Sequence, residues 1–197
     1  MRQMGRMHYK GDIFHIAQVL EGKIQSYSYL VERHKDHVFN LALRICGSYE
    51  DAEEIAQDSF MKAYRSLPKF RMESSFSTWL YRIVYNTAIS HVRSGKDEML
   101  SIEEFPAEAA DFLSNNPDEE AAEAEYRNSL INFALKKINS DERALITLYY
   151  YDELGINEIS DITGISKSNV KVKLYRARQK LSEIIEKNEK KNMIYYE

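Results

Sequence analysis

GINEISDITGISKSNVKVKLYRARQKL, residues 155–181, contains two amphipathic segments separated by a glycine. The first segment, INEISDIT, is long enough for about two helical turns. Gly164 follows it, at the position where a helix end favours a left-handed residue. Ser166 is a good cap for a second helix over about residues 166–180. Two helices joined by a tight glycine turn predict a helix-turn-helix unit.

The second helix of this unit separates an apolar stripe from a basic surface. The stripe, at helical spacing, predicts a face packed against the preceding helices and consists of Val170, Leu174, Ala177 and Leu181. The candidate DNA contacts are Lys167, Ser168, Asn169, Lys171, Lys173, Tyr175, Arg176 and Arg178. Cations suit the phosphates of duplex DNA, and short polar side chains near the helix N-terminus suit base edges. The alternative is a solvated basic helix without a partner.

Charge is unevenly distributed along the chain. The formal net charge is −4, yet residues 97–125 contain 11 acids and no base, which leaves 20 acids against 27 bases elsewhere. A segment with this composition repels itself and buries little apolar surface. We therefore predict an acidic linker over residues 96–126, between domains at 1–95 and 127–197. Such a tether could also mimic nucleic acid in a basic channel of a partner.

Residues before the linker show helical periodicity. A first helix is expected from about Ile13 to Gly22, and a second ends near Gly47. Ser48 is expected to cap the next helix, and a last helix should span about 77–93.

After the linker, a helix over about 122–138 and a helix capped by Ser140 precede the helix-turn-helix. Asp141 and Glu142 lie in the first turn of the latter, where the helix dipole favours acids. The chain should thus be all-α, with two small helical domains joined by an acidic linker and a helix-turn-helix in the C-terminal domain.

A second functional signal is FSTWLYRIVYNTAISHVR, residues 76–93. One side of this helix carries core residues such as Trp79. The other side interleaves aromatic and polar groups, namely Tyr81, Arg82, Tyr85 and Asn86. Aromatic faces can stack bases and arginine can hold a strand backbone. The alternative is a core helix with tyrosines at its margins.

Other classes of protein find no support in the sequence. No apolar run is long enough to span a membrane, and the N-terminus lacks a signal-peptide core. The single Cys46 excludes an internal disulfide, fits a reducing compartment and is interpreted as a small buried residue. His34 and His37 lack further ligands nearby and predict a surface pair rather than a metal site. No nucleotide-binding or hydrolase motif appears. We therefore expect no catalysis, cofactor, small-molecule substrate or membrane insertion.

Over residues 13–186 the ordered motifs together resemble bacterial RNA polymerase sigma factors of the extracytoplasmic-function (ECF) group. The stretches that carry the resemblance are SYEDAEEIAQDSFMKAYRSLPKF (48–70), FSTWLYRIVYN (76–86), the acidic linker and YYYDELGINEISDITGISKSNVKVKLYRARQKL (149–181). The resemblance implies a cytoplasmic protein that binds core polymerase, recognises two promoter elements and helps to open the DNA.

The resemblance also implies roles for particular residues. The residues that would dock on core polymerase are Asp51, Glu54, Gln57, Asp58 and Met61. Those that would contact the −10 element and capture an extruded base are Phe70, Arg71, Ser74, Ser75, Tyr81, Arg82, Tyr85, Asn86 and Arg93. The candidate DNA contacts of the basic helix would read the −35 element. An anti-sigma factor is a further partner that the resemblance suggests.

One residue departs from the family pattern. An acid usually stands four residues after the asparagine that corresponds to Asn86, and here that position is Ser90. Two other functions remain open. A stand-alone helix-turn-helix regulator would bind duplex DNA without polymerase, usually as a dimer. A pure interaction module would occupy polymerase without reading DNA, although the basic helix argues against it.

Overall fold

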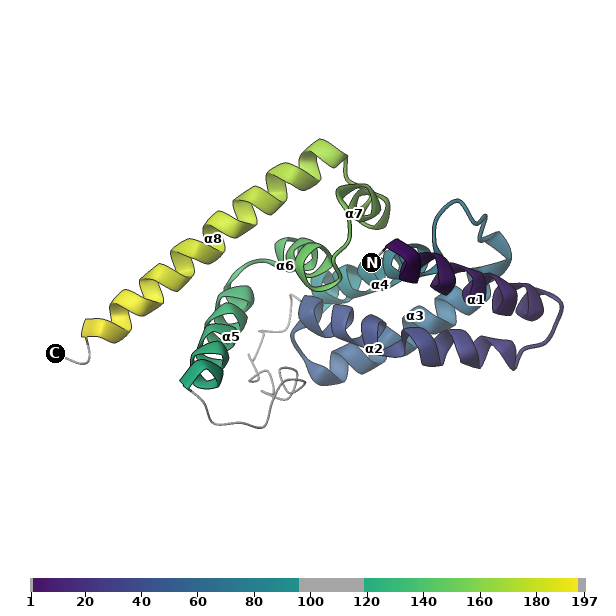
Figure 1. The fold of residues 1–197 in the computed structure, drawn as a ribbon, viewed down its shortest axis with the longest axis horizontal. Coiled ribbons are helices and arrows are strands. Elements are labelled where there is room, and N and C mark those ends of the chain that lie inside the picture. The colour runs from purple at the N-terminus through teal and green to yellow at the C-terminus, as the bar shows by residue number, and fades with distance from the viewer. Residues whose placement is uncertain (1, 96–118, 195–197) are drawn as a thin grey trace.

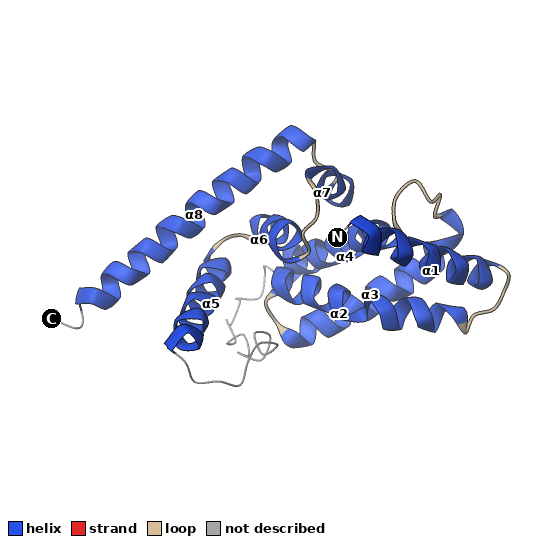
Figure 2. Cartoon of the chain, in the orientation of Figure 1, coloured by secondary structure: helices blue, strands red, loops and turns tan. Residues whose placement is uncertain are grey.

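The computed structural model describes residues 2–95 and 119–194, and the secondary structure within these ranges is helical (Figure 2). The first range forms one group of helices (Figure 1). Its elements are α1 (Arg2–Leu20), α2 (Ser26–Cys46), α3 (Tyr49–Ser66), the short 3₁₀ helix η1 (Leu67–Lys69) and α4 (Phe76–Ser94). α2, α3 and α4 pack against one another, and α1 packs on α2.

The second range holds the expected helix-turn-helix unit. Its elements are α5 (Glu119–Lys137), α6 (Ser140–Ile146), the π-helical turn η4 (Thr147–Tyr151), α7 (Ile156–Thr163) and α8 (Lys167–Ile194). α8 crosses the group as a long helix and packs on α5, α6 and α7 (Figure 1). The all-α prediction is confirmed. Most of the expected linker lies outside the described residues, but α5 begins at Glu119, so the end of that range is helical.

Local signals place several helix ends where the sequence predicted them. Gly47 and Gly164 adopt left-handed φ values of 84° and 73°, as C-terminal residues of helices often do. The Ser48 side chain accepts a hydrogen bond from the backbone N–H of Asp51 at 3.2 Å. The Ser166 side chain accepts one from the N–H of Asn169 at 3.4 Å.

Two helix starts differ from the prediction. Asn139, rather than Ser140, caps α6, because the Asn139 side chain accepts the hydrogen bond from the N–H of Glu142 at 2.8 Å. Both residue types cap well, so sequence alone does not choose between neighbours. α1 begins at Arg2, well before the expected start near Ile13.

The interpretation of His34 as a surface residue is wrong. Its side chain is buried, and its Nε2 lies 3.3 Å from Oδ2 of Asp12, itself buried on α1. Arg33 approaches the same carboxylate at 3.5 Å. The Asp12 carboxylate therefore ties α1 to α2, and His34 serves packing rather than a surface pair with the exposed His37.

The two groups of helices pack on each other. α4 contacts α6 and α7, while α2 contacts α6 and η4. Leu80 and Val84 of α4 belong to the same buried cluster as Ile159 and Ile162 of α7. In this conformation the chain therefore has one continuous core across both domains.

Candidate nucleic-acid interface

The N-terminal half of α8 presents the predicted basic surface. Gly164 turns the chain between α7 and α8, and Ser160 of α7 fixes this turn by donating its hydroxyl to the carbonyl of Ile165 at 2.7 Å. Val170, Leu174 and Ala177 are buried, as the stripe predicted. The candidate contacts are exposed except for Lys173, which is half-buried. A row of cations and short polar groups thus faces outward from the start of the helix.

Some side chains farther along α8 already have partners. Arg178 donates to the hydroxyl of Tyr150 at 3.3 Å. Gln179 donates to the hydroxyl of Tyr175 at 2.8 Å, while the Tyr175 ring remains exposed. Lys180 forms an ion pair with Glu142 of α6. The contacts of Arg178 and Lys180 hold α8 to the rest of its own domain, whereas the one between Gln179 and Tyr175 lies within α8.

The loop between η1 and α4, residues 70–75, carries the first candidates for single-stranded DNA. Phe70 is half-buried, with its ring centroid 5.0 Å from that of Trp79. Arg71 is well exposed, with Glu73 at 4.0 Å. The Ser75 side chain caps α4 by accepting the N–H of Thr78 at 3.1 Å, and Ser74 donates its hydroxyl to the Ser75 carbonyl.

Met72 is a candidate in this loop that the sequence did not indicate. Its φ of 58° is unusual for a non-glycine residue, and its side chain is 40% exposed. Unusual backbone conformations often occur at ligand-binding loops, although they do not by themselves identify one. No local sequence signal marks this position, because neither glycine nor asparagine occupies it.

The outward face of α4 carries four exposed polar residues at spacings of three and four. They are Arg82, Asn86, Ser90 and Arg93. The serine that replaces the usual acid therefore lies on the same stripe as the candidate DNA contacts. Its neutral side chain leaves this stripe without a negative charge that would repel phosphates.

Tyr81 and Tyr85 do not share this exposed face, contrary to the prediction. Tyr81 is only 6% exposed, and burial raises the pKa of its phenol, with Asp152 as a second cause. Tyr85 is half-buried and donates to Oδ1 of Asp141 at 3.2 Å; burial, with the Asp141 charge and hydrogen bond, raises its pKa to about 12. Both rings turn toward the C-terminal domain because it packs on this side of α4.

The exposed face of α3 matches the predicted docking stripe. Glu54, Gln57, Asp58 and Met61 are exposed, whereas Ile55 and Ser59 between them are buried. Asp58 pairs with Lys62 at 2.7 Å. Asp51 is half-buried and lies 3.2 Å from Nε2 of His91, which links α3 to α4. The stripe combines an exposed methionine, a residue type that is enriched at protein interfaces, with acidic and amide side chains that suit the polar rim of one.

Cys46 has no features of a reactive thiol. Burial raises the pKa of Cys46 to about 11, and its Sγ donates a hydrogen bond to the carbonyl of Ser48. Its half-buried position agrees with the expected structural role.

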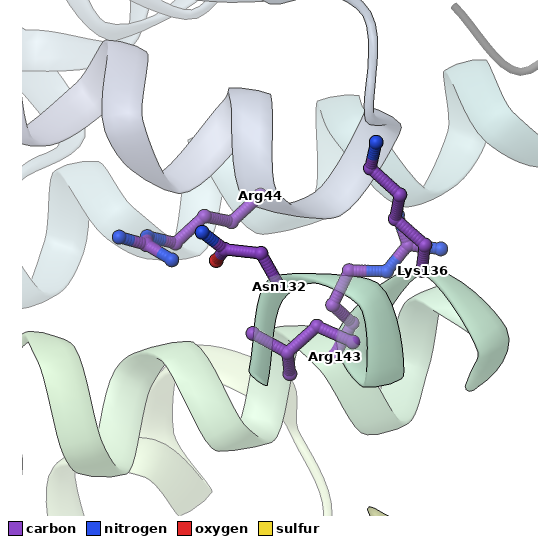
Figure 3. A pocket seen from close by; sticks show the side chains of 5 residues that line it. Arg44, Asn132, Lys136 and Arg143 are labelled. Atoms are coloured by element: carbon purple, nitrogen blue, oxygen red, sulfur yellow. The ribbon is translucent and has the colours of Figure 1, made fainter. Parts of the chain in front are cut away.

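One hollow lies where α2 meets α5 and α6, and Figure 3 shows the side chains that line it. Its lining consists of Arg44, Asn132, Leu135, Lys136 and Arg143. The free space is about 10 Å³, which is room for about one water molecule. Burial lowers the pKa of the Arg143 guanidinium. The size of this hollow excludes a bound organic cofactor there.

Two further classes of site were sought in the described parts of the chain. Within residues 2–95 and 119–194, no group of His, Cys, Asp and Glu side chains is arranged to hold a metal ion. No helix within those ranges is both long and apolar enough to cross a membrane.

Known proteins resemble this chain over most of its length. Residues 30–98 match the family Sigma-70 region 2, and residues 130–181 match Sigma-70, region 4. The ECF RNA polymerase sigma factor SigW of Bacillus subtilis is 33% identical, over 84% of this chain and 92% of that protein. An ECF RNA polymerase sigma-E factor of Salmonella typhimurium is 31% identical, over 83% of this chain and 88% of its own length.

Solved structures share the fold. CnrH, determined in complex with the cytosolic domain of CnrY, superposes with a TM-score of 0.64 at 23% identity, covering 89% of this chain and 97% of that one. RpoE of Bartonella quintana, determined with the anti-sigma factor NepR, gives a TM-score of 0.64 at 21% identity, covering 82% and 98%. Sequence similarity over more than four fifths of the chain, together with the helix-turn-helix and the exposed stripes of α3 and α4, leads to one conclusion. The chain belongs to the ECF sigma factors, which are transcription initiation factors of bacterial RNA polymerase.

Proposed function

We propose that this sigma factor docks on core RNA polymerase through the exposed stripe of α3. Asp51, Glu54, Gln57, Asp58 and Met61 supply this surface. The stripe mixes apolar and acidic groups, and most of it makes no contact with the C-terminal domain, so it is accessible in the free chain. A protein interface of this kind takes most of its binding energy from a few central side chains.

Promoter recognition at the −35 element is assigned to the N-terminal half of α8. The observation that supports this most directly is an exposed row of residues at the N-terminal end of α8, directly after the tight turn. The row consists of Lys167, Ser168, Asn169 and Lys171. A helix-turn-helix unit places this end of its second helix in the major groove. Tyr175 and Arg176 follow about one turn farther along as further −35 contacts, and Lys173 and Arg178 supply cations for the phosphates.

Recognition and opening of the −10 element are assigned to the 70–75 loop and to α4. Arg71, Arg82, Asn86 and Arg93 are exposed and offer donors to the strand. Phe70, Ser74 and Ser75 shape the loop, and Tyr81 and Tyr85 supply rings on the adjacent side of α4. Extruding a base costs a few kcal/mol, and stacking and hydrogen bonds to the flipped base recover this cost.

An anti-sigma factor is the remaining partner that we propose. Two proteins of similar fold were determined with protein partners: CnrH with the cytosolic domain of CnrY, and RpoE of Bartonella quintana with the anti-sigma factor NepR. A protein with this function acts in the cytoplasm, where core polymerase and promoter DNA are present. The polymerase performs the chemistry, so no catalytic group is needed in this chain.

Runoff transcription with core polymerase over a promoter library tests the proposal. Initiation that requires both this chain and paired −35 and −10 elements is expected. Sequence-specific duplex binding without polymerase, with no effect on initiation, would instead identify a stand-alone regulator. Binding to polymerase without promoter preference would identify a pure interaction module.

A further inference from the structure

We propose that the hollow between α2, α5 and α6 binds a phosphate group, either as the free ion or as the end of a phosphate ester. Three of the side chains that line it are cations, and they come from three helices (Figure 3). Arg44 belongs to α2, Lys136 to α5 and Arg143 to α6. The site lies apart from the polymerase and promoter contacts proposed above, so it adds an anionic ligand to this chain.

The Arg143 guanidinium is the centre of the site, because its charge is shielded from water and lacks a carboxylate partner within the described residues. Its Nε is buried and has no hydrogen-bond partner there. Its Nη2 donates to the carbonyl of Ile138 at 3.4 Å, which is a long contact with a neutral group. Burial lowers the pKa of the guanidinium, and the neighbouring described group that acts on this pKa is the Cys46 thiol, not an acid. A buried charge of this kind is destabilising unless an anion pairs with it.

Two further cations increase the positive potential at the same place. The Arg44 guanidinium lies over the Tyr151 ring, 3.6 Å from its centroid. A guanidinium that stacks on a ring keeps its N–H donors in its own plane, where they can reach an anion. Lys136 brings a third positive charge, and the Asn132 side chain adds an amide donor. Like charges around one hollow repel one another, and a bound anion offsets that repulsion.

The arrangement of the donors favours phosphate over a carboxylate. A carboxylate has two oxygens in one plane, which suits a single guanidinium fork. A phosphate group is tetrahedral, so it can accept hydrogen bonds from donors that approach from three helices. Its charge of about −1.5 to −2 at neutral pH also offsets more of the positive charge of the site.

The size of the hollow decides how much of the ligand enters. The free space is about 10 Å³, which is enough for one oxygen atom of the group. Arg44, Asn132 and Lys136 are half-buried rather than buried, so the hollow lies close to the surface. One oxygen would enter beside Arg143, while the rest of the group and any ester attached to it stay outside.

Calorimetric titration and thermal unfolding of the full chain test this inference. The probes are inorganic phosphate, adenosine 5′-monophosphate and adenosine, each at the same ionic strength. Arg143→Met removes the shielded charge and keeps an apolar side chain of similar length. Arg65→Met is the matched control, since it removes the same charge from an exposed position of α3. Arg44→Gln is a second variant of the site, on another helix.

At least one of the two phosphate probes should bind the unaltered chain with a Kd below about 1 mM, and adenosine should not bind. At a tenfold excess over this Kd, the unfolding temperature should rise by about 3 °C or more, as for a ligand that binds only the folded form. Arg143→Met and Arg44→Gln should each weaken binding by about tenfold or more, because a charge-assisted hydrogen bond is lost. Arg65→Met should keep the affinity and the shift. Circular dichroism checks that each variant retains its helices.

The two phosphate probes separate the sources of the group, and either result supports the site. Binding of inorganic phosphate shows that the free ion is sufficient, whereas binding of adenosine 5′-monophosphate alone assigns the site to a phosphate ester. Three results would overturn the inference. One is no binding of either probe, and another is binding of adenosine as tight as that of its monophosphate. The third is equal stabilisation of Arg143→Met and the unaltered chain, which would mean an adventitious ion only, since phosphate salts stabilise many folded proteins without a site.

Discussion

Tyr85 of α4 donates a hydrogen bond to Asp141 of α6 at 3.2 Å, across 56 positions of the sequence. The same carboxylate lies 3.5 Å from Nη2 of Arg93, which stands about two helical turns after Tyr85 on α4. Asp141 lies in the first turn of α6, where the helix dipole favours its negative charge. It also contacts Tyr85 and Arg93, which are two of the candidate DNA contacts. The consequences of this arrangement, and of the exposed stripes, can be measured in five ways.

Replacing Gln57 and Asp58 together by alanine should weaken binding to core polymerase by about tenfold or more, since central interface side chains often contribute 1–2 kcal/mol or more each. Both side chains are exposed, so helicity should be unchanged. Affinity for core enzyme and circular dichroism are the measurements. Glu183→Ala is the charge control on another surface. Unchanged affinity in the double variant would contradict the docking role of α3.

The cap that Ser75 forms on α4 can be separated from its proposed DNA contact. Ser75→Ala should lower the free energy of unfolding by about 1 kcal/mol, because the cap on the Thr78 N–H is lost. Ser75→Asp keeps a capping oxygen and should retain stability, but its charge should repel a DNA strand. Thermal unfolding and open-complex formation distinguish the roles. Normal promoter opening by Ser75→Asp would show that the DNA does not approach this cap.

Asn86→Ala should reduce open-complex formation more than closed-complex binding. Asn86 is exposed on the outward stripe of α4, so its loss should leave the fold intact. Permanganate reactivity of promoter thymines reports opening, and filter binding reports the closed complex. Ser90→Ala, on the same stripe, is the control and should change neither. Equal losses in both assays would assign Asn86 to docking or stability instead.

Lys171→Ala and Arg176→Ala should change sequence preference at the −35 element, since a lost base contact costs about 1–3 kcal/mol at one base pair. Lys180 pairs with Glu142, so Lys180→Ala should change only overall affinity or nothing. Binding is titrated at several salt concentrations on matched and mutated −35 sequences. Uniform weakening, with a salt slope reduced by about 1, would identify phosphate contacts and make α8 an electrostatic clamp.

The packing of the two groups of helices on each other should weaken as pH rises. The Asp152 carboxylate, 3.9 Å from Nδ1 of His37, is the main cause that raises the pKa of His37, with the charge of Asp36 adding to it and burial opposing it. A raised pKa in this packed arrangement means that the stabilisation is fully present below the ordinary histidine pKa and is lost as pH rises through the raised value. Radius of gyration between about pH 5.5 and 8.5 should therefore increase slightly. His37→Gln should lose this dependence; an identical pH profile in that variant would contradict the assignment.

The helix-turn-helix could be predicted from the sequence because its signals are local. Gly164 adopts the left-handed conformation and Ser166 caps α8, and each property depends on a few neighbouring residues. The apolar stripe of α8 could be predicted equally well, since helical spacing alone decides which side chains share a face. The same reasoning identified the exposed stripe around Gln57. The membership of the chain in the ECF sigma factors followed from the order of such motifs, whereas the role of each site residue stays a prediction.

Tertiary structure alone decided what the sides of α4 and α2 contact. The position of Tyr81 in the sequence is compatible both with the margin of a buried core and with an exposed surface that stacks bases. Tyr81 is buried because α7, far along the sequence, packs against α4. The sequence around His34 is compatible with a surface pair, but in the structure its Nε2 lies 3.3 Å from Oδ2 of Asp12 on α1. The sequence by itself determined the helices, their apolar faces and the basic end of α8, because backbone hydrogen bonding and periodicity are local. The sequence left open which amphipathic side chains become interdomain contacts. Those contacts form between segments that are far apart in the sequence, and no local pattern indicates which distant segments pack together.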